Sequence, residues 1–127
     1  MTAFLSLDFL YVPCGEVDTA AEELVDQLGA ELAWKVHGMG TVVACVRVSG
    51  EGPALLLSGH LAGEAPILVY RVEDYSAATA ELRSAGIGLR ELEIPHGPCA
   101  SFAVAGQRLA VYELVRPGVD RHFADRT

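Results

Sequence analysis

Residues 67–86, ILVYRVEDYSAATAELRSAG, contain a strand, a turn, a helix and a helix stop in direct succession. The apolar, β-branched run at 67–72 predicts a buried strand. Asp74 is a preferred residue for the N-cap of a helix, and apolar residues recur after it at helical spacing. The apolar positions of this helix and the glycine that ends it are Ala78, Leu82, Ala85 and Gly86.

The same order of elements occurs earlier, in residues 9–29, FLYVPCGEVDTAAEELVDQLG. The apolar start at 9–12 predicts a strand. Thr19 and Glu22 have the spacing of a capping box, so the helix is predicted over 19–28, with Gly29 as its stop.

The two halves continue to agree beyond their helices. A His-Gly pair follows in each half, at His37 and at His96, and further apolar strands separated by glycine turns come next. The sequence therefore predicts an internal repeat of a β-α-β-β-β unit, over about residues 5–58 and 65–115. The chain is predicted to be a single domain over residues 1–127, with a tail at 116–127.

Composition excludes several classes of function. Of the 127 residues 51% are hydrophobic, which is ample for a core, while the formal net charge of −8 argues against nucleic-acid binding. The unbroken apolar stretches are far shorter than the ~20 residues that cross a bilayer, so no membrane association is expected. The N-terminus has no basic start, and three widely spaced cysteines predict reduced thiols, so we expect a cytoplasmic protein.

The sequence resembles the vicinal oxygen chelate superfamily, which includes glyoxalase I, extradiol dioxygenases and bleomycin-resistance proteins. The resemblance rests on the strand-Asp-helix-Gly opening of each half and on the segments 68–74 (LVYRVED), 94–97 (IPHG) and 106–114 (GQRLAVYEL). It implies an α+β fold of two βαβββ modules, which form a curved mixed sheet around a cavity with the helices outside. It also implies a homodimer.

The enzymes that the sequence resembles hold a divalent metal with His, Glu or Gln side chains from the first and last strand of each half. Carried over, these positions are Phe9, Leu55 (or a residue one place away), Ile67 and Ala110. None of these side chains can bind a metal. Asp8 and Glu113 lie one and three residues from Phe9 and Ala110, so strand alternation predicts that they face away from the cavity. We therefore predict no metal and no cofactor.

The same alternation predicts which side chains line the cavity, and three further residues are candidates for ligand contacts. Trp34 is interpreted as a core anchor or an aromatic platform. Arg47 is interpreted as an edge residue or an anchor for a carboxylate or phenolate. His96 either belongs to a loop that it shares with His37, or contacts a ligand and transfers a proton. The predicted lining is Phe9, Tyr11, Leu55, Leu57, Ile67, Val69, Ala110 and Tyr112.

Two functions from different classes follow from these observations. The first is a metal-free small-molecule-binding protein of the glyoxalase/bleomycin-resistance type, which sequesters an aromatic or cationic compound. The alternative is an enzyme of the same superfamily, a lyase, isomerase or dioxygenase, working through a missed metal site or through His96, Tyr11 or Tyr112. A third hypothesis is a dimerising module whose cavity is filled by side chains.

Overall fold

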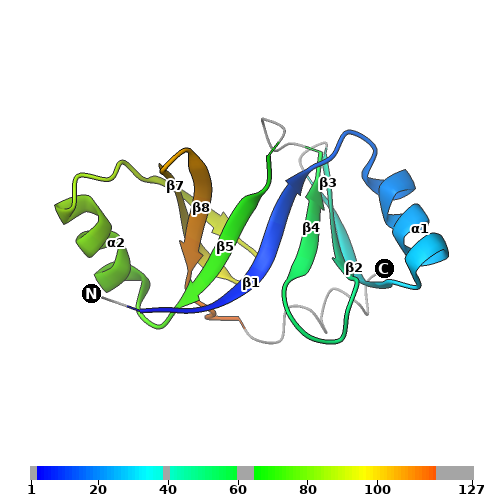
Figure 1. Ribbon diagram of the computed structural model, residues 1–127, viewed down its shortest axis with the longest axis horizontal. Helices are drawn as coiled ribbons and strands as arrows, with labels where there is room; N and C mark the ends of the chain where they lie inside the picture. Colours follow the sequence, from blue (N-terminus) through cyan, green and yellow to red (C-terminus); the bar gives the residue numbers. More distant parts are fainter. Residues whose placement is uncertain (1–2, 39–40, 60–64, 117–127) are drawn as a thin grey trace. The chain divides into compact units, whose positions relative to one another are not determined.

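The computed structural model describes residues 3–38, 41–59 and 65–116, which form two units (Figure 1). The α1 unit contains the described residues of 9–66, and the α2 unit contains residues 3–8 and 67–116. Both follow the order β-α-β-β-β, which confirms the predicted α+β fold of two βαβββ modules. The elements are β1 (Phe4–Pro13), α1 (Val17–Leu28), β2 (Glu31–Gly38), β3 (Thr41–Arg47), β4 (Ala54–Ser58), β5 (Ile67–Val72), α2 (Tyr75–Ser84), β6 (Arg90–Ile94), β7 (Gly97–Val104) and β8 (Gln107–Tyr112).

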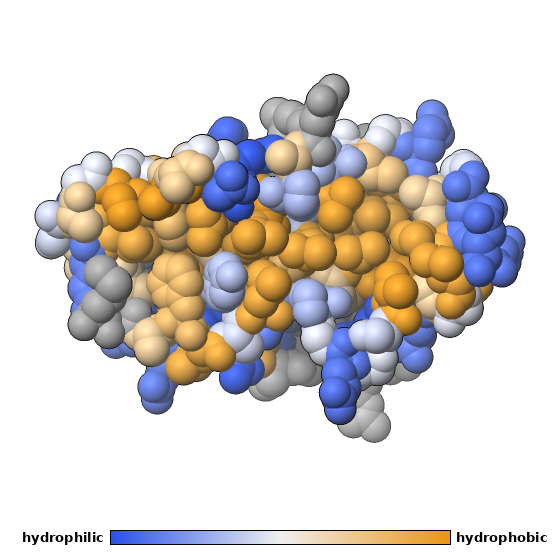
Figure 2. Space-filling view, viewed as in Figure 1, coloured by the Kyte–Doolittle hydropathy of each residue, from blue (hydrophilic) through white to orange (hydrophobic). Residues whose placement is uncertain are grey.

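The strands of the α1 unit are ordered β2-β3-β4-β1, and only β1 and β4 run parallel among these pairs. One face of this sheet packs against α1. The outer side of α1 is hydrophilic, as Figure 2 shows at the right of the molecule. The helix therefore has one apolar stripe and one solvated face. The core between helix and sheet consists of Val17, Ala21, Ala30, Ala44, Val46 and Leu57, with Val12, Leu24 and Leu55 beside them.

The α2 unit repeats this arrangement, with the strands in the order β5-β8-β7-β6 and with β5 and β8 parallel. Its helix covers one face of the sheet, where Val72, Ala78, Leu82, Ala100, Phe102 and Val111 are buried together. Because side chains alternate along a strand, the neighbours of these residues on β5, β7 and β8 lie on the opposite face. That face carries the candidate site described below.

The start of α1 differs from the prediction. The helix begins at Val17, with Glu16 at the N-cap position and no side-chain hydrogen bond to the cap, so the capping box of Thr19 and Glu22 does not form. Two more residues are helical than the capping box predicts, and Thr19 lies in the first turn. The stop at Gly29 is confirmed, since this residue has a left-handed φ of 67° and its N–H bonds back to the helix.

The start of α2 is the one that the sequence predicts. The Asp74 carboxylate accepts a hydrogen bond of 3.0 Å from the Ala77 N–H. Replacing Asp74 with alanine is expected to lower the free energy of unfolding by about 1 kcal/mol, because a first-turn N–H loses its acceptor. Urea denaturation of the variant, with Ser76→Ala as a control on the same exposed turn, checks this value. An equal loss in both variants would contradict the capping role.

No helix within the described ranges is long and apolar enough to cross a membrane.

Candidate functional site

Four polar side chains meet on the face of the α2 unit that is opposite α2. The Tyr112 hydroxyl donates a hydrogen bond of 2.5 Å to Oδ2 of Asp8, and the Ser6 hydroxyl donates one of 2.6 Å to Oδ1. The His96 ring lies edge-on to Tyr112, with ring centroids 6.1 Å apart and planes inclined by 73°. Tyr112 and His96 are only 2% and 3% exposed. The phenol and the imidazole are therefore buried, and the carboxylate that bonds to the phenol is partly buried.

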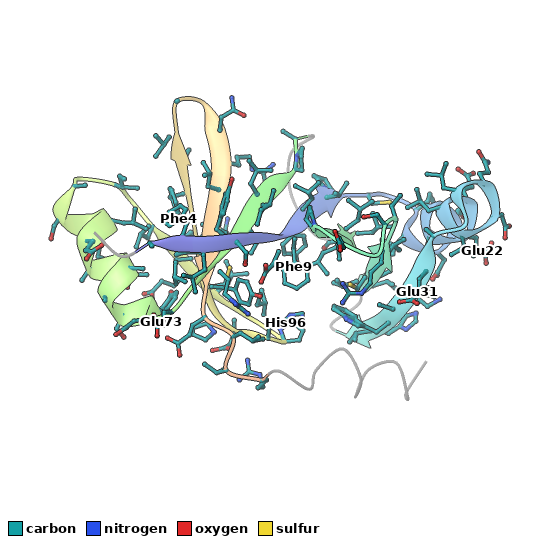
Figure 3. The ribbon with its side chains drawn as sticks, turned by 60° about the horizontal axis from the view of Figure 1, so that its bottom comes forward. Phe4, Phe9, Glu22, Glu31, Glu73 and His96 are labelled. Atoms are coloured by element: carbon teal, nitrogen blue, oxygen red, sulfur yellow. The ribbon has the colours of Figure 1, made fainter. Side chains whose placement is uncertain are left out.

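His96 owes its position to a tight turn. It follows Pro95 between β6 and β7, where Ile94 pairs with Gly97, and Figure 3 labels its side chain. The backbone carbonyl of His96 accepts hydrogen bonds from the N–H groups of Val115 (3.0 Å) and Arg116 (3.1 Å). The segment after β8 is thus tied to the residue that carries the imidazole.

Gly97 allows this turn to pack against the chain that follows β8. A Cβ at position 97 would lie 2.0 Å from the backbone carbonyl oxygen of Glu113. The Glu113 N–H also donates to the Pro98 carbonyl, at 3.2 Å. Any side chain at 97 would therefore push the turn away from the segment that follows β8, which starts at Glu113, one residue after Tyr112.

Arg116 holds the other side of the same turn. Its guanidinium donates hydrogen bonds to the Pro95 carbonyl at 2.5 Å and to the Ile94 carbonyl at 2.9 Å, and it pairs with Glu93 at 2.6 Å. The sequence predicts that this residue lies in a tail. In the structure it fixes the residues just before His96, and the rest of the predicted tail, residues 117–127, lies outside the described residues.

Asp8 and Glu113 were both predicted to face away from the cavity. Glu113 does point to the α2 side, where its Oε1 accepts a hydrogen bond of 2.8 Å from the N–H of Tyr75 at the start of the helix. The prediction is wrong for Asp8, because its carboxylate bonds to Tyr112 on the opposite face. The prediction for Asp8 takes the direction of Phe9 as its reference. Phe9 belongs to the α1 unit, whereas Asp8 belongs to the α2 unit and bonds to Tyr112 there.

Tyr75 links α2 to two strands of its sheet. Its hydroxyl donates to Glu91 at 2.7 Å and to the Cys99 carbonyl at 3.3 Å. Burial, followed by the hydrogen bond to Glu91, raises the pKa of Tyr75 above its ordinary value. This phenol therefore stays protonated and acts as a structural donor that ties α2 to its sheet.

The remaining candidates of the α2 unit lie where the alternation predicts. Val69 pairs with Ala110, and both are buried on the face that carries Tyr112. Ile67 is two residues before Val69 and lies on the same face. These hydrocarbon side chains therefore share one face of the sheet with Tyr112.

The candidates of the α1 unit are divided between the two faces of its sheet. Leu55 and Leu57 pack in the core under α1, so their prediction as cavity lining is wrong. The register pairs Leu57 with Val12 of that core, and it pairs Tyr11 with Leu56 on the other face. Residues 55–57 are all leucine and show no apolar-polar alternation. The sequence therefore does not indicate which of them face α1 and which face the other side of the sheet. The residues of β4 on the face away from α1 are Ala54, Leu56 and Ser58.

Phe9, Tyr11, Trp34 and Arg47 lie on that same face of the α1 unit, away from α1. Trp34 pairs with Cys45 and has no exposed surface, which favours its interpretation as a core anchor. Phe9 and Tyr11 are also buried, whereas Arg47 is only partly buried, at the end of β3.

Cys99 is buried on β7, where a thiolate forms with difficulty. Burial, and secondarily the charge of Glu93, raises the pKa of the Cys99 thiol to about 12. Because the thiolate is the nucleophile, we expect Cys99 to resist iodoacetamide at pH 8 in the folded protein, while the partly exposed Cys14 reacts first. Peptide mass spectrometry before and after unfolding checks the order. Alkylation of Cys99 in the folded protein at the rate of Cys14 would contradict it.

A pocket of about 650 Å³ in the α2 unit lies apart from this group. Its lining includes Ala3, Leu5 and three carboxylates, those of Glu73, Asp74 and Glu113. Asp74 and Glu113 accept hydrogen bonds from N–H groups of the first turn of α2, and Glu73 lies at the same end of the helix (Figure 3). The carboxylates are therefore explained by the helix start, and we place the candidate site at Asp8, Tyr112 and His96.

Comparison with solved structures identifies the fold. The methylmalonyl-CoA epimerase of Mycobacterium tuberculosis superposes with a TM-score of 0.73 at 21% identity, over 92% of this chain and 95% of that chain. A Streptomyces coelicolor methylmalonyl-CoA epimerase in complex with 2-nitronate-propionyl-CoA gives a TM-score of 0.74 at 15% identity, over 90% and 97%. The chain has the vicinal oxygen chelate fold. No protein-family model and no curated protein matches its sequence.

The metal that the vicinal oxygen chelate resemblance implies does not fit these residues. Phe9, Ile67 and Ala110 offer no donor atom, and neither Leu55 nor its neighbours Ala54 and Leu56 offer one. Within the described ranges no three His, Cys, Asp or Glu side chains are grouped so that they can hold a metal ion. Any chemistry at the described site must therefore use Asp8, Tyr112 and His96 themselves.

Proposed function

We propose that this chain is an isomerase-type enzyme, which moves a proton at a carbon next to a carbonyl group without a metal ion. The observation that carries the proposal is the hydrogen bond from Tyr112 to Asp8, with His96 against the same phenol ring. Paired acid and base groups in a buried setting suit proton transfer. The similarity in fold to methylmalonyl-CoA epimerases supports an isomerase over the lyases and dioxygenases of the superfamily.

In the proposed reaction the Asp8 carboxylate takes the proton from the substrate carbon, and the electron pair of the C–H bond moves onto the carbonyl oxygen as an enolate. The Tyr112 hydroxyl no longer faces an anionic acceptor once Asp8 is protonated, so it donates to the enolate oxygen. A protonated His96 then gives a proton to the other face of the carbon. The configuration is inverted, and Asp8 and His96 exchange roles in the reverse direction.

His96 is assigned the second proton transfer because it contacts a different part of Tyr112 from Asp8. Asp8 bonds to the hydroxyl, whereas the imidazole meets the phenol ring in a T-shaped arrangement. Imidazole titrates near neutral pH and can both donate and accept a proton there.

Proton exchange in D₂O tests this proposal. Methylmalonyl-CoA and other 2-substituted acyl thioesters are incubated with the protein, and the loss of the ¹H NMR signal of the C2 proton is compared with the buffer rate. We expect exchange above that rate, and we expect it to survive EDTA. Exchange that stops with EDTA and returns with a divalent metal would contradict the metal-free mechanism, and no exchange with any of the thioesters would contradict the function.

A specific observation favours a second function, the binding protein. Hydrocarbon at the positions that correspond to metal ligands, and the buried Phe9, Tyr11 and Trp34, suit an apolar ligand that is held and not transformed. Ligands that raise the melting temperature without any proton exchange would support this function over the enzyme. The homodimer also stays a prediction, which the mass of the particle in solution would check.

A further inference from the structure

Arg71 lies on the same face of the α2 unit as the Asp8–Tyr112 pair. On β5 it is the partner of Tyr112 in the parallel register, and the preceding pair is Tyr70 with Val111. Val111 and Val72 are buried in the core under α2. Strand alternation therefore directs Arg71 and Tyr112 together to the opposite face, from adjacent positions on neighbouring strands.

Arg71 also differs from Arg83 and Arg116 of the α2 unit, because its side chain has no partner among the described residues. Arg83 pairs with Glu91 at 3.0 Å, and Arg116 pairs with Glu93 at 2.6 Å. Within the part of the chain that the structure describes, Arg71 has neither a hydrogen bond nor an ion pair through its side chain. This is unexpected in a chain with 17 Asp and Glu residues against nine Lys and Arg residues.

The environment of Arg71 is partly apolar. The residue is partly buried, and its neighbours on this face include the hydrocarbon side chains of Val69 and Ala110. Removing a cation from water without pairing it lowers stability, so folded proteins rarely keep such a group without a function. A guanidinium in this state is prepared for a ligand oxygen, because its planar N–H groups bind carboxylates and phosphates in a bidentate manner.

We propose that Arg71 forms an anion-binding subsite beside the Asp8–Tyr112 pair, so that the ligand presents an anionic oxygen group to this face of the α2 unit. This inference rests on the proposed function, and it adds the class of substrate. Two sources have the required chemistry, a carboxylate on the acyl group and a phosphate on its carrier. A charged substituent at this place also orients the carbon toward Asp8.

Stability without ligand gives the first test. Arg71→Met keeps the aliphatic stem and removes the charge, and Arg83→Gln removes one charge from the α2 side as a control. We expect the melting temperature of R71M to equal or exceed that of the wild type, because no protein contact is lost. A melting temperature lower than that of R83Q would assign Arg71 a structural role and overturn the inference.

Binding gives the second test, by calorimetry with methylmalonyl-CoA, propionyl-CoA and coenzyme A. The first two differ by one carboxylate. We expect R71M to bind methylmalonyl-CoA about tenfold to a hundredfold more weakly, as for a lost hydrogen bond to a charged group, and R71K to recover part of the loss. A loss confined to methylmalonyl-CoA identifies the carboxylate, and an equal loss for all three identifies a carrier phosphate. Unchanged binding in R71M, or no binding by the wild type, overturns the inference.

The outcome for Arg71 and the outcome for the proposed function are separable. Binding that depends on Arg71 but is accompanied by no exchange in D₂O contradicts the isomerase and leaves the anion subsite intact. Exchange that proceeds equally in R71M, with unchanged affinity, contradicts the subsite and leaves the isomerase intact.

Discussion

Replacing Gly97 with alanine is expected to lower the free energy of unfolding by about 2–4 kcal/mol, the range for a forced backbone shift in a packed region. The added Cβ would lie 2.0 Å from the Glu113 carbonyl oxygen, which is backbone and cannot rotate away. Relief requires the 95–98 turn to separate from the chain after β8, and this movement breaks the hydrogen bonds from Val115 and Arg116 to the His96 carbonyl. Urea denaturation measures the loss.

Gly88→Ala is the matched control for Gly97. A Cβ at position 88 meets no atom within 4 Å, so this variant should change stability by less than about 0.5 kcal/mol. We also expect G97A to move the imidazole ¹H NMR signals of His96, because the turn that carries the imidazole moves relative to the Tyr112 ring. A G97A protein as stable as G88A would show that the turn is not locked against Glu113.

The second large effect is expected on proton exchange. Asp8→Asn and Tyr112→Phe should each slow enzymatic exchange by about 10²- to 10⁴-fold, the usual contribution of a positioned acid or base. The first variant removes the base, and the second removes the donor that bonds to Asp8 at 2.5 Å. Exchange rates of the two single variants and of the double variant are measured by NMR in D₂O.

Tyr70→Phe is the control for the loss of a phenol. Tyr70 is on β5, where its ring contacts Phe4 with centroids 5.4 Å apart, and it pairs with Val111 on the α2 side of the sheet. Its exchange rate should equal that of the wild type. If Asp8 and Tyr112 act as one unit, the double variant should be little slower than either single variant. Two independent, multiplying losses would be evidence against the pair.

The elements of the fold could be predicted from sequence because local signals agree with the repeat. The strand at 67–72 and the cap at Asp74 were found at their observed places, and Gly29 ends α1 as expected. The capping box at Thr19 failed because the helix continues two residues further toward the N-terminus, to a cap position that offers no side-chain hydrogen bond.

The candidate site was only partly predictable. Tyr112 and His96 are among the residues that the sequence predicts for the site. Asp8 is not, because strand alternation from Phe9 predicts that it faces away, and β1 contributes to both units. His96 was paired with His37, yet His37 is an exposed residue within β2, and Gly38 pairs with Thr41 where Gly97 pairs with Ile94. The two His-Gly pairs match in sequence, but their histidines occupy different places in the two units: His37 is within a strand, and His96 is in a turn. The backbone clash that requires Gly97 involves Glu113, and no pattern in the sequence reports it.

The course of β1 limits how the chain could be divided. Residues 67–116 supply Tyr112, His96 and Arg71, but Asp8 reaches them from a strand at the other end of the chain. A fragment cut between the two repeats would keep the phenol and the imidazole and lose the carboxylate. Restoring the pair would then require adding residues 3–8 as a separate peptide, or joining them to the fragment by circular permutation.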